Sequence, residues 1–165
     1  MSKLILGLGS NLNEPVFQLQ KAVDYLKNHF LLLKVSRIYT SLSLLKDNQD
    51  DYYNAAVLAE TDKTPLEVLD IIKSIENSMG RIKLKKWGER NIDIDIIDFN
   101  REIIKYENLE IPHNQMIYRS FVLLPLLDIV PDYIHPVNNL SLKNMIDNLS
   151  DDYNIKVLND KSLFL

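Results

Sequence analysis

A chain of 165 residues with 46% hydrophobic content is the size of one domain that can bury an ordinary core. Its formal net charge of −4 argues against a general binder of nucleic acid or anionic membranes, whose surface would be basic. Because the sequence contains no cysteine, thiol catalysis, disulfides and thiolate metal sites are excluded.

The first part of the chain predicts a strand, a helix and two further strands. Residues 3–8, KLILGL, are a short apolar run typical of a buried strand. Asn13 is predicted to cap a helix with Pro15 in its first turn. Apolar residues then recur at helical spacing: Val16, Leu19, Val23, Leu26 and Phe30. The β-rich segments 31–40 and 52–60 are separated by a polar stretch, so we expect two strands joined by a loop.

A second helix and a fourth strand follow. Thr64, Pro65 and Glu67 have the spacing of a capping box with proline in the first helical turn. The helix that they begin has one apolar face, and Gly80 is predicted to end it. That face carries Val68, Ile72, Ile75 and Met79. The next strand is the segment IDIDII, residues 92–97.

The order β-α-β-β-α-β is that of an α+β, ferredoxin-like fold, with an antiparallel sheet and both helices on one side. Beyond it, residues 101–111 suggest a short hairpin arm. Ser120 to Ile129 and residues 141–150 are expected to form a C-terminal helical extension. No repeat or linker divides the chain, so we expect residues 1–165 to be a single domain.

The segment WGERNIDIDIIDFN, residues 87–100, combines strand-like alternation with paired carboxylates. Successive side chains of a strand point to opposite faces, so Ile92, Ile94 and Ile96 share one face and Asp93 and Asp95 the other. Two carboxylates about 6.6 Å apart repel each other unless a positive group lies between them. A half-buried strand with an acidic outer face is the ordinary alternative.

A basic segment, RIKLKKWGER, leads directly into this strand. Its five cationic residues oppose one Glu, which gives +4 (five minus one) in a chain of net charge −4. A charge run is usually a solvated loop. Carboxylates bind Mg²⁺, Mg²⁺ binds phosphate oxygens, and Arg and Lys bind the remaining oxygens, so the combination predicts a polyphosphate site. The lone G-x-G at residues 7–9 is too weak a motif for a phosphate-binding loop.

Four segments together resemble the 6-hydroxymethyl-7,8-dihydropterin pyrophosphokinases of folate synthesis. They are LGLGSNL near the start, DYYNAAV at 51–57, WGERNIDIDII at 87–97 and IPHNQMIYRSFVLLPLLDIVPD at 111–132. The resemblance runs from about Leu4 to Pro131. It implies a ferredoxin-like fold and transfer of the β,γ-pyrophosphoryl group of ATP to the hydroxymethyl oxygen of the pterin, with release of AMP.

The resemblance also implies a role for each matching residue. Asp93 and Asp95 would bind two Mg²⁺ ions and act in catalysis with Arg81 and Arg90. The ATP site would comprise Glu76, Lys83, Ile96, Leu109, His113 and Arg119. The pterin site would comprise Ser41, Leu44, Tyr52, Asn54, Trp87 and Phe121. For these aromatic residues core packing is the ordinary alternative, and His113 and Arg119 could be structural, Arg119 as a helix cap.

Two other functions are compatible with paired aspartates or a ferredoxin-like sheet. A nucleotide cyclase or polymerase palm would release pyrophosphate and would not need the pterin set. An RNA-binding module would need aromatic residues on its strands, which KLILGLG and DYYNAAV do not supply.

We expect ATP and the hydroxymethyl pterin as substrates, with no nucleic acid or membrane partner, and a monomer. The apolar runs are too short for a signal peptide or a membrane span, so we expect a cytoplasmic protein.

Overall fold

The structure is a computed structural model that describes residues 1–41, 51–80, 91–150 and 154–163. Of residues 159–162 it describes the backbone. In chain order the elements are β1 Ser2–Ser10, α1 Pro15–Lys27, β2 Leu31–Val35, β3 Arg37–Ser41, β4 Tyr52–Thr61, α2 Pro65–Ser78, β5 Asp93–Phe99, β6 Ile104–Tyr106, β7 Leu109–Ile111, the 3₁₀ turn η1 Met116–Tyr118, α3 Ser120–Ile129, α4 Leu142–Asp147 and β8 Lys156–Ser162. This order confirms the predicted β-α-β-β-α-β core, with β2 and β3 together as its second strand.

The main sheet has the strand order β5-β1-β4-β3-β8, with β2 also paired to β4. Strand β1 is central and antiparallel to both neighbours, β4 and β5. The strands β6 and β7 form a separate hairpin at the expected position. A further strand, β8, was not expected from the sequence and extends the sheet beyond β3.

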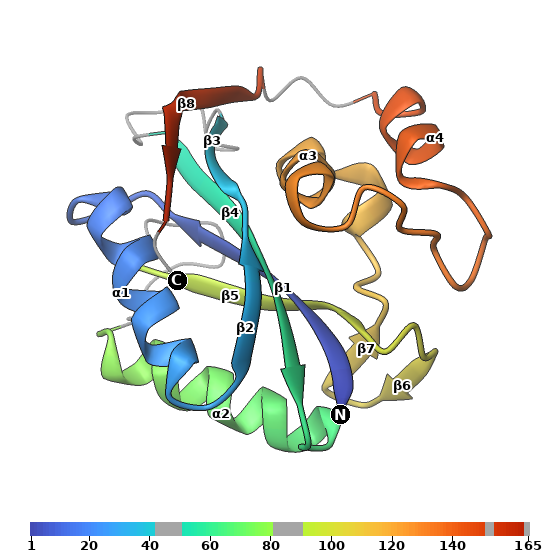
Figure 1. Cartoon of the computed structure of the whole chain (residues 1–165), viewed down its shortest axis with the longest axis horizontal. Coiled ribbons are helices and arrows are strands. Elements are labelled where there is room, and N and C mark those ends of the chain that lie inside the picture. The colour runs from blue at the N-terminus through green and yellow to red at the C-terminus, as the bar shows by residue number, and fades with distance from the viewer. Residues whose placement is uncertain (42–50, 81–90, 151–153, 164–165) are drawn as a thin grey trace.

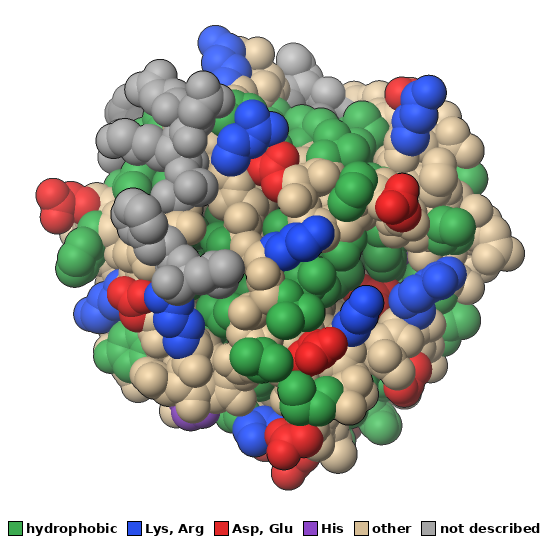
Figure 2. All heavy atoms as spheres, viewed as in Figure 1, with side chains coloured by type: hydrophobic (Ala, Val, Ile, Leu, Met, Phe, Trp, Pro, Cys, Tyr) green, Lys and Arg blue, Asp and Glu red, His purple; other side chains and the backbone are tan. Residues whose placement is uncertain are grey.

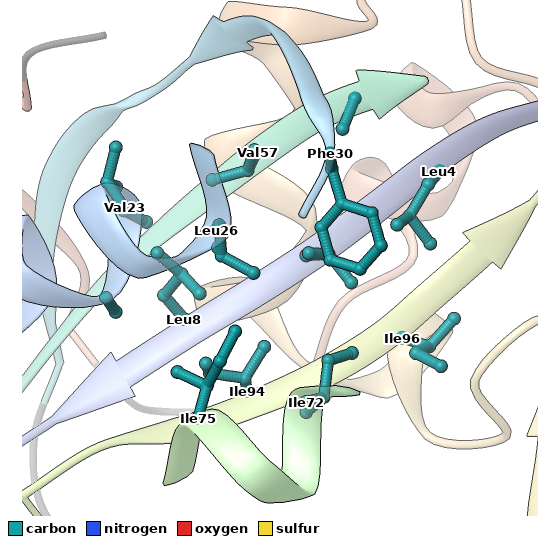
Figure 3. Packing of buried hydrophobic residues seen from close by; sticks show 14 of the residues in the cluster. Leu4, Leu8, Val23, Leu26, Phe30, Val57, Ile72, Ile75, Ile94 and Ile96 are labelled. Carbon is teal, nitrogen blue, oxygen red and sulfur yellow. The ribbon is translucent and has the colours of Figure 1, made fainter. Parts of the chain in front are cut away.

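Helices cover both faces of this sheet (Figure 1). Helices α1 and α2 bury one face, and Figure 3 shows Ile72 and Ile75 of α2 lying against Ile94 of β5. On the opposite face α3 and α4 pack against a second apolar cluster that includes Ile5, Leu58 and Ile97. No helix of the described residues is long and apolar enough to cross a membrane.

The second helix begins and ends as its sequence predicts. Thr64 Oγ1 accepts from the backbone N–H of Glu67, whose side chain in turn accepts from the Thr64 N–H, which completes the capping box. Gly80 follows the helix with φ of 78°, a left-handed conformation that favours glycine.

The prediction that Asn13 caps α1 is wrong. The residue before the helix is Glu14, no side chain caps the first turn, and both Asn13 and Glu14 have positive φ. The Asn13 amide instead donates to Asn91 Oδ1 at 2.7 Å. The Asn13 side chain therefore bonds to Asn91, 78 residues away in the chain, and not to the first turn of α1.

Helix α3 is tied to the sheet by one carboxylate. Asp128 accepts from the backbone N–H and the guanidinium of Arg37, at 2.9–3.2 Å, and from the hydroxyl of Tyr39 at 3.1 Å. These contacts fix the last turn of α3 over the start of β3, on the face of the sheet opposite α1 and α2.

Candidate active site

Strand β5 has the two faces that its alternation predicts. Ile92, Ile94 and Ile96 are buried in the cluster beneath α1 and α2. Asp93 and Asp95 are half-buried on the opposite face. The two carboxylates therefore point to the side of the sheet on which α3 lies.

The register of β1 sets what lies beside each aspartate. Gly9 is paired with both Asp93 and Asn54, and Gly7 with both Asp95 and Ala56. Paired residues of antiparallel strands project to the same face. Since Gly9 has no side chain, the space between Asp93 and Asn54 is not filled by β1. A Cβ added at Gly9 would lie 3.4 Å from Asn54 Oδ1, an ordinary van der Waals contact.

Three of the predicted pterin residues meet at the ends of β3 and β4. The buried Asn54 amide donates to Ser41 Oγ at 2.9 Å, and Ser41 is paired with Tyr52. This bond leaves Asn54 Oδ1 turned toward Gly9. Phe121, a fourth, lies in the first turn of α3 with the Arg119 guanidinium 5.6 Å from its ring centre.

His113 lies within electrostatic range of both Asp93 and Arg119. Burial and the positive charge of Arg119 lower the pKa of His113, while Asp93 and Glu110 act in the opposite direction. His113 Nδ1 accepts from the Gln115 N–H at 3.2 Å, so neutral His113 carries its proton on Nε2. Arg119 precedes α3, but its side chain makes no capping bond there.

Three residues of the predicted ATP site, Glu76, Ile96 and His113, belong to or contact β5. Glu76, 4% exposed, accepts from the Ile94 N–H at 2.9 Å, and the His113 N–H donates to the Ile97 carbonyl at 2.9 Å. Ile96 lies between these two points. Leu109 of β7 is buried in the same apolar cluster as Ile96. Glu76 therefore also has a structural role on the edge of the strand.

Five predicted residues lie outside the described part of the chain: Leu44, Arg81, Lys83, Trp87 and Arg90. Their proposed roles rest on the sequence. Within the described ranges, no group of three or more His, Cys, Asp or Glu residues could hold a metal ion by itself.

Sequence reasoning missed a buried carboxylate on the aspartate face. Asp98, 2% exposed, accepts from the Tyr133 hydroxyl at 2.7 Å and from the Arg101 N–H at 2.8 Å. Burial and the charge of Asp98 raise the pKa of Tyr133, which keeps the phenol protonated as a donor. An extra residue of β5 between Ile96 and Asp98 interrupts the pairing with β1. In the sequence, Asp98 follows the D-x-D pattern of Asp93 and Asp95, and nothing there distinguishes it as a buried carboxylate.

These features define a ferredoxin-like protein with paired carboxylates on one face of the sheet and a histidine that interacts with both Asp93 and Arg119, a combination suited to a polyphosphate substrate. Residues 5–131 match the family model of 7,8-dihydro-6-hydroxymethylpterin-pyrophosphokinase (HPPK). The chain belongs to this family.

Similar proteins cover nearly the whole chain. It is 41% identical to the 2-amino-4-hydroxy-6-hydroxymethyldihydropteridine pyrophosphokinase of Haemophilus influenzae, over 92% of this chain and 96% of that protein. The Aquifex aeolicus protein of the same name is 37% identical over 87% and 89% of the two chains. The Folic acid synthesis protein FOL1 of Dictyostelium discoideum is 41% identical over 91% of this chain but only 23% of its own length.

A solved structure supports the fold. The wild-type HPPK-DHPS protein of Plasmodium falciparum with SDX-DHP superposes with a TM-score of 0.69 at 22% identity, covering 89% of this chain and 43% of that one. The family membership assigns the reaction. The chain is a pyrophosphokinase that transfers the pyrophosphoryl group of ATP to hydroxymethyldihydropterin in folate synthesis.

The lowered pKa of His113 predicts a pH dependence of folding stability. An unfolded histidine titrates near pH 6.5, whereas the folded state resists protonation of this one. The contribution of neutral His113 to the unfolding free energy is therefore complete above about pH 6.5, and it is lost as the pH falls through the lower pKa of the folded state. We expect His113→Gln to lose less unfolding free energy than wild type between pH 7 and 5.5, by at most about 1.4 kcal/mol per pH unit.

Urea unfolding at several pH values measures this slope. The matched control is His29→Gln, because His29 is exposed. The buried His135, whose pKa is also lowered by burial, stays in both variants and contributes equally. Identical pH slopes for wild type and His113→Gln would contradict the prediction.

Proposed function

We propose that the two substrates meet above Gly9, with the ATP phosphates toward Asp93 and Asp95 and the pterin toward Asn54. The observation that carries this proposal is the shared pairing of Gly9 with Asp93 on one side and Asn54 on the other. Adjacent strands lie about 4.8 Å apart, so two strand spacings separate the groups for the two substrates. Such a spacing suits direct transfer between them.

Asp93 and Asp95 fit Mg²⁺. They are hard oxygen donors on one face of a strand, and Gly9, which is paired with Asp93, adds no side chain between Asp93 and Asn54. Mg²⁺ is commonly held by one or two carboxylates together with substrate phosphates and water, so two protein carboxylates are enough. Two bound ions would neutralise charge on the triphosphate and hold it in line for transfer.

The remaining phosphate oxygens are bound by cationic and N–H donors. Neutral His113 donates from Nε2, and Arg119 supplies a planar guanidinium. The sequence adds Arg81, Lys83 and Arg90. Arg81 and Arg90 act in catalysis by stabilising charge on the transferred group. No general base is assigned, because this transfer depends mainly on alignment and charge stabilisation.

The adenosine lies along the outer edge of β5 near Ile96, between the contacts of Glu76 and His113 with the strand. Leu109 provides an apolar contact. On the other side of Gly9, Asn54 Oδ1 accepts from the N–H edge of the pterin, because its amide group is held by Ser41. Tyr52 and Phe121, with Leu44 and Trp87, enclose the flat ring.

In the transfer, the hydroxymethyl oxygen of the pterin forms a bond to the β-phosphorus of ATP. The bond from that phosphorus to the oxygen bridging to the α-phosphate breaks, and AMP leaves with the bridging oxygen. The proton of the hydroxymethyl group is released to water.

The protein acts in the cytoplasm as a single-domain monomer, with small-molecule substrates and no nucleic-acid partner. On the face that Figure 2 shows, Lys and Arg are interspersed with Asp and Glu among the described residues.

Product analysis tests this function. Protein, ATP, Mg²⁺ and hydroxymethyl-dihydropterin should give AMP and pterin pyrophosphate in equal amounts. Neither should form without the pterin. Release of pyrophosphate in a pterin-independent reaction would instead support a cyclase-like or polymerase-like enzyme, and formation of ADP a simple kinase.

Asp95→Asn separates the metal role from a structural one. The change is nearly isosteric and relieves repulsion of about 1–2 kcal/mol or less between carboxylates on one face. We expect a melting temperature in EDTA equal to or above that of wild type. Most activity, and most of the stabilisation by Mg²⁺-ATP, should be lost because ligand stabilisation follows affinity for the native state.

The matched control is Asp98→Asn on the same strand. Asp98 is buried and accepts two hydrogen bonds, so this variant should lose about 1–3 kcal/mol of stability in EDTA. If Asp95→Asn melts as low as Asp98→Asn, Asp95 is structural. If Asp95→Asn retains wild-type turnover, it is not a metal ligand.

A further inference from the structure

Asn91 joins three segments of the chain just before β5. Its Nδ2 donates to the carbonyls of Met79 and Gly80 at 3.2 and 3.3 Å. Its Oδ1 accepts from Asn13 Nδ2 at 2.7 Å, and its backbone carbonyl accepts from the buried hydroxyl of Ser10. The end of β1, the turn before α1 and the end of α2 are thereby held to one residue.

An amide side chain is suited to this position. The last carbonyls of a helix have no partner within the helix and need donors, while the Asn13 amide needs an acceptor. Asparagine supplies both from one planar group. The left-handed conformation of Gly80, with φ of 78°, favours glycine, and its carbonyl is one of the two that Asn91 binds.

The hydrogen bonds of Asn91 affect the position of Asp93 more than that of Asp95. Asp93 is the first residue of β5, and strand ends open more readily than interiors. Asp95 lies further in, paired with Gly7 and next to Ile94, whose N–H is bound by Glu76. The bonds of Asn91 begin two residues before Asp93 and hold the chain from which that residue enters the sheet.

We propose that Asn91 is a positioning residue for Asp93: its hydrogen bonds hold the start of β5 so that the two carboxylates keep the spacing that Mg²⁺-ATP requires. This inference rests on the proposed role of Asp93 as a metal ligand. Residues that orient a metal ligand typically change metal affinity by 10–100-fold when they are removed.

Two measurements on Asn91→Ala test the proposal. The first is amide hydrogen exchange of residues 92–95 in the protein without ligands, which should become faster while exchange of 96–99 stays the same. The second is a Mg²⁺ titration of the thermal stabilisation given by a non-hydrolysable ATP analogue. The Mg²⁺ concentration at half-maximal stabilisation should rise about tenfold.

The matched control is Ser141→Ala, which removes the side chain that caps α4. It should lower the melting temperature by about 2–4 °C, as the loss of a helix cap does. It should change neither the amide exchange of residues 92–95 nor the Mg²⁺ concentration at half-maximal stabilisation. Asn13→Gly removes only the bond to Oδ1 and suits the positive φ of that residue. Its effect should be smaller than that of Asn91→Ala, and the double variant should be no worse than Asn91→Ala alone.

Faster exchange with an unchanged Mg²⁺ midpoint would make Asn91 purely structural and overturn the proposal, as would unchanged exchange. If the analogue stabilises wild type equally without Mg²⁺, the proposed metal site itself fails and this inference falls with it. That result is distinguishable because it appears in wild type.

Discussion

The antiparallel pairing of β1 with both β4 and β5 is the constraint on which the site depends. Because β1 lies between β4 and β5, each residue from Leu4 to Gly9 is paired on both sides and fixes a row of three residues across the sheet. The row through Gly9 joins Asp93 to Asn54, and the row through Gly7 joins Asp95 to Ala56. A slip of one residue would turn both aspartates toward α1 and α2 and bury them without water. The burial of Ile92, Ile94 and Ile96 on that side stabilises the register.

The opposite face of the sheet is divided between core and site. Near Ile5, Leu58 and Ile97 it is covered by α3 and α4, and Asp98 is bound there to Tyr133. Toward Gly9, side chains from several elements converge instead of packing into one apolar cluster. The extra residue of β5 at Ile97 lies between the two regions. The hydrogen bonds of Asp128 with Arg37 and Tyr39 hold α3 on the sheet. Phe121, in the first turn of α3, therefore lies at the margin of the site.

Local patterns in the sequence predicted the fold and the two faces of β5. The capping box at Thr64 and the glycine stop at Gly80 were visible because their partners lie within a few residues. The error at Asn13 and the omission of Asn91 have the opposite cause, since their bonds join residues 78 apart in the chain. In the sequence the glycines of β1 form only a weak phosphate-loop motif, because their effect on the site depends on the register of β1 with β4 and β5. Strand β8 has no apolar alternation, and its place follows from its pairing with β3.

The affinity of Gly9→Ala for each substrate tests the central claim most directly. Among the described residues the added methyl would meet Asn54 Oδ1 alone, at 3.4 Å, so the variant should fold with an unchanged melting temperature. It would nevertheless stand between Asp93 and Asn54. Calorimetry with a non-hydrolysable ATP analogue and Mg²⁺ should show pterin affinity reduced at least about tenfold, which corresponds to about 1.4 kcal/mol. Unchanged pterin affinity and turnover in a folded Gly9→Ala would contradict a meeting of the substrates above this residue.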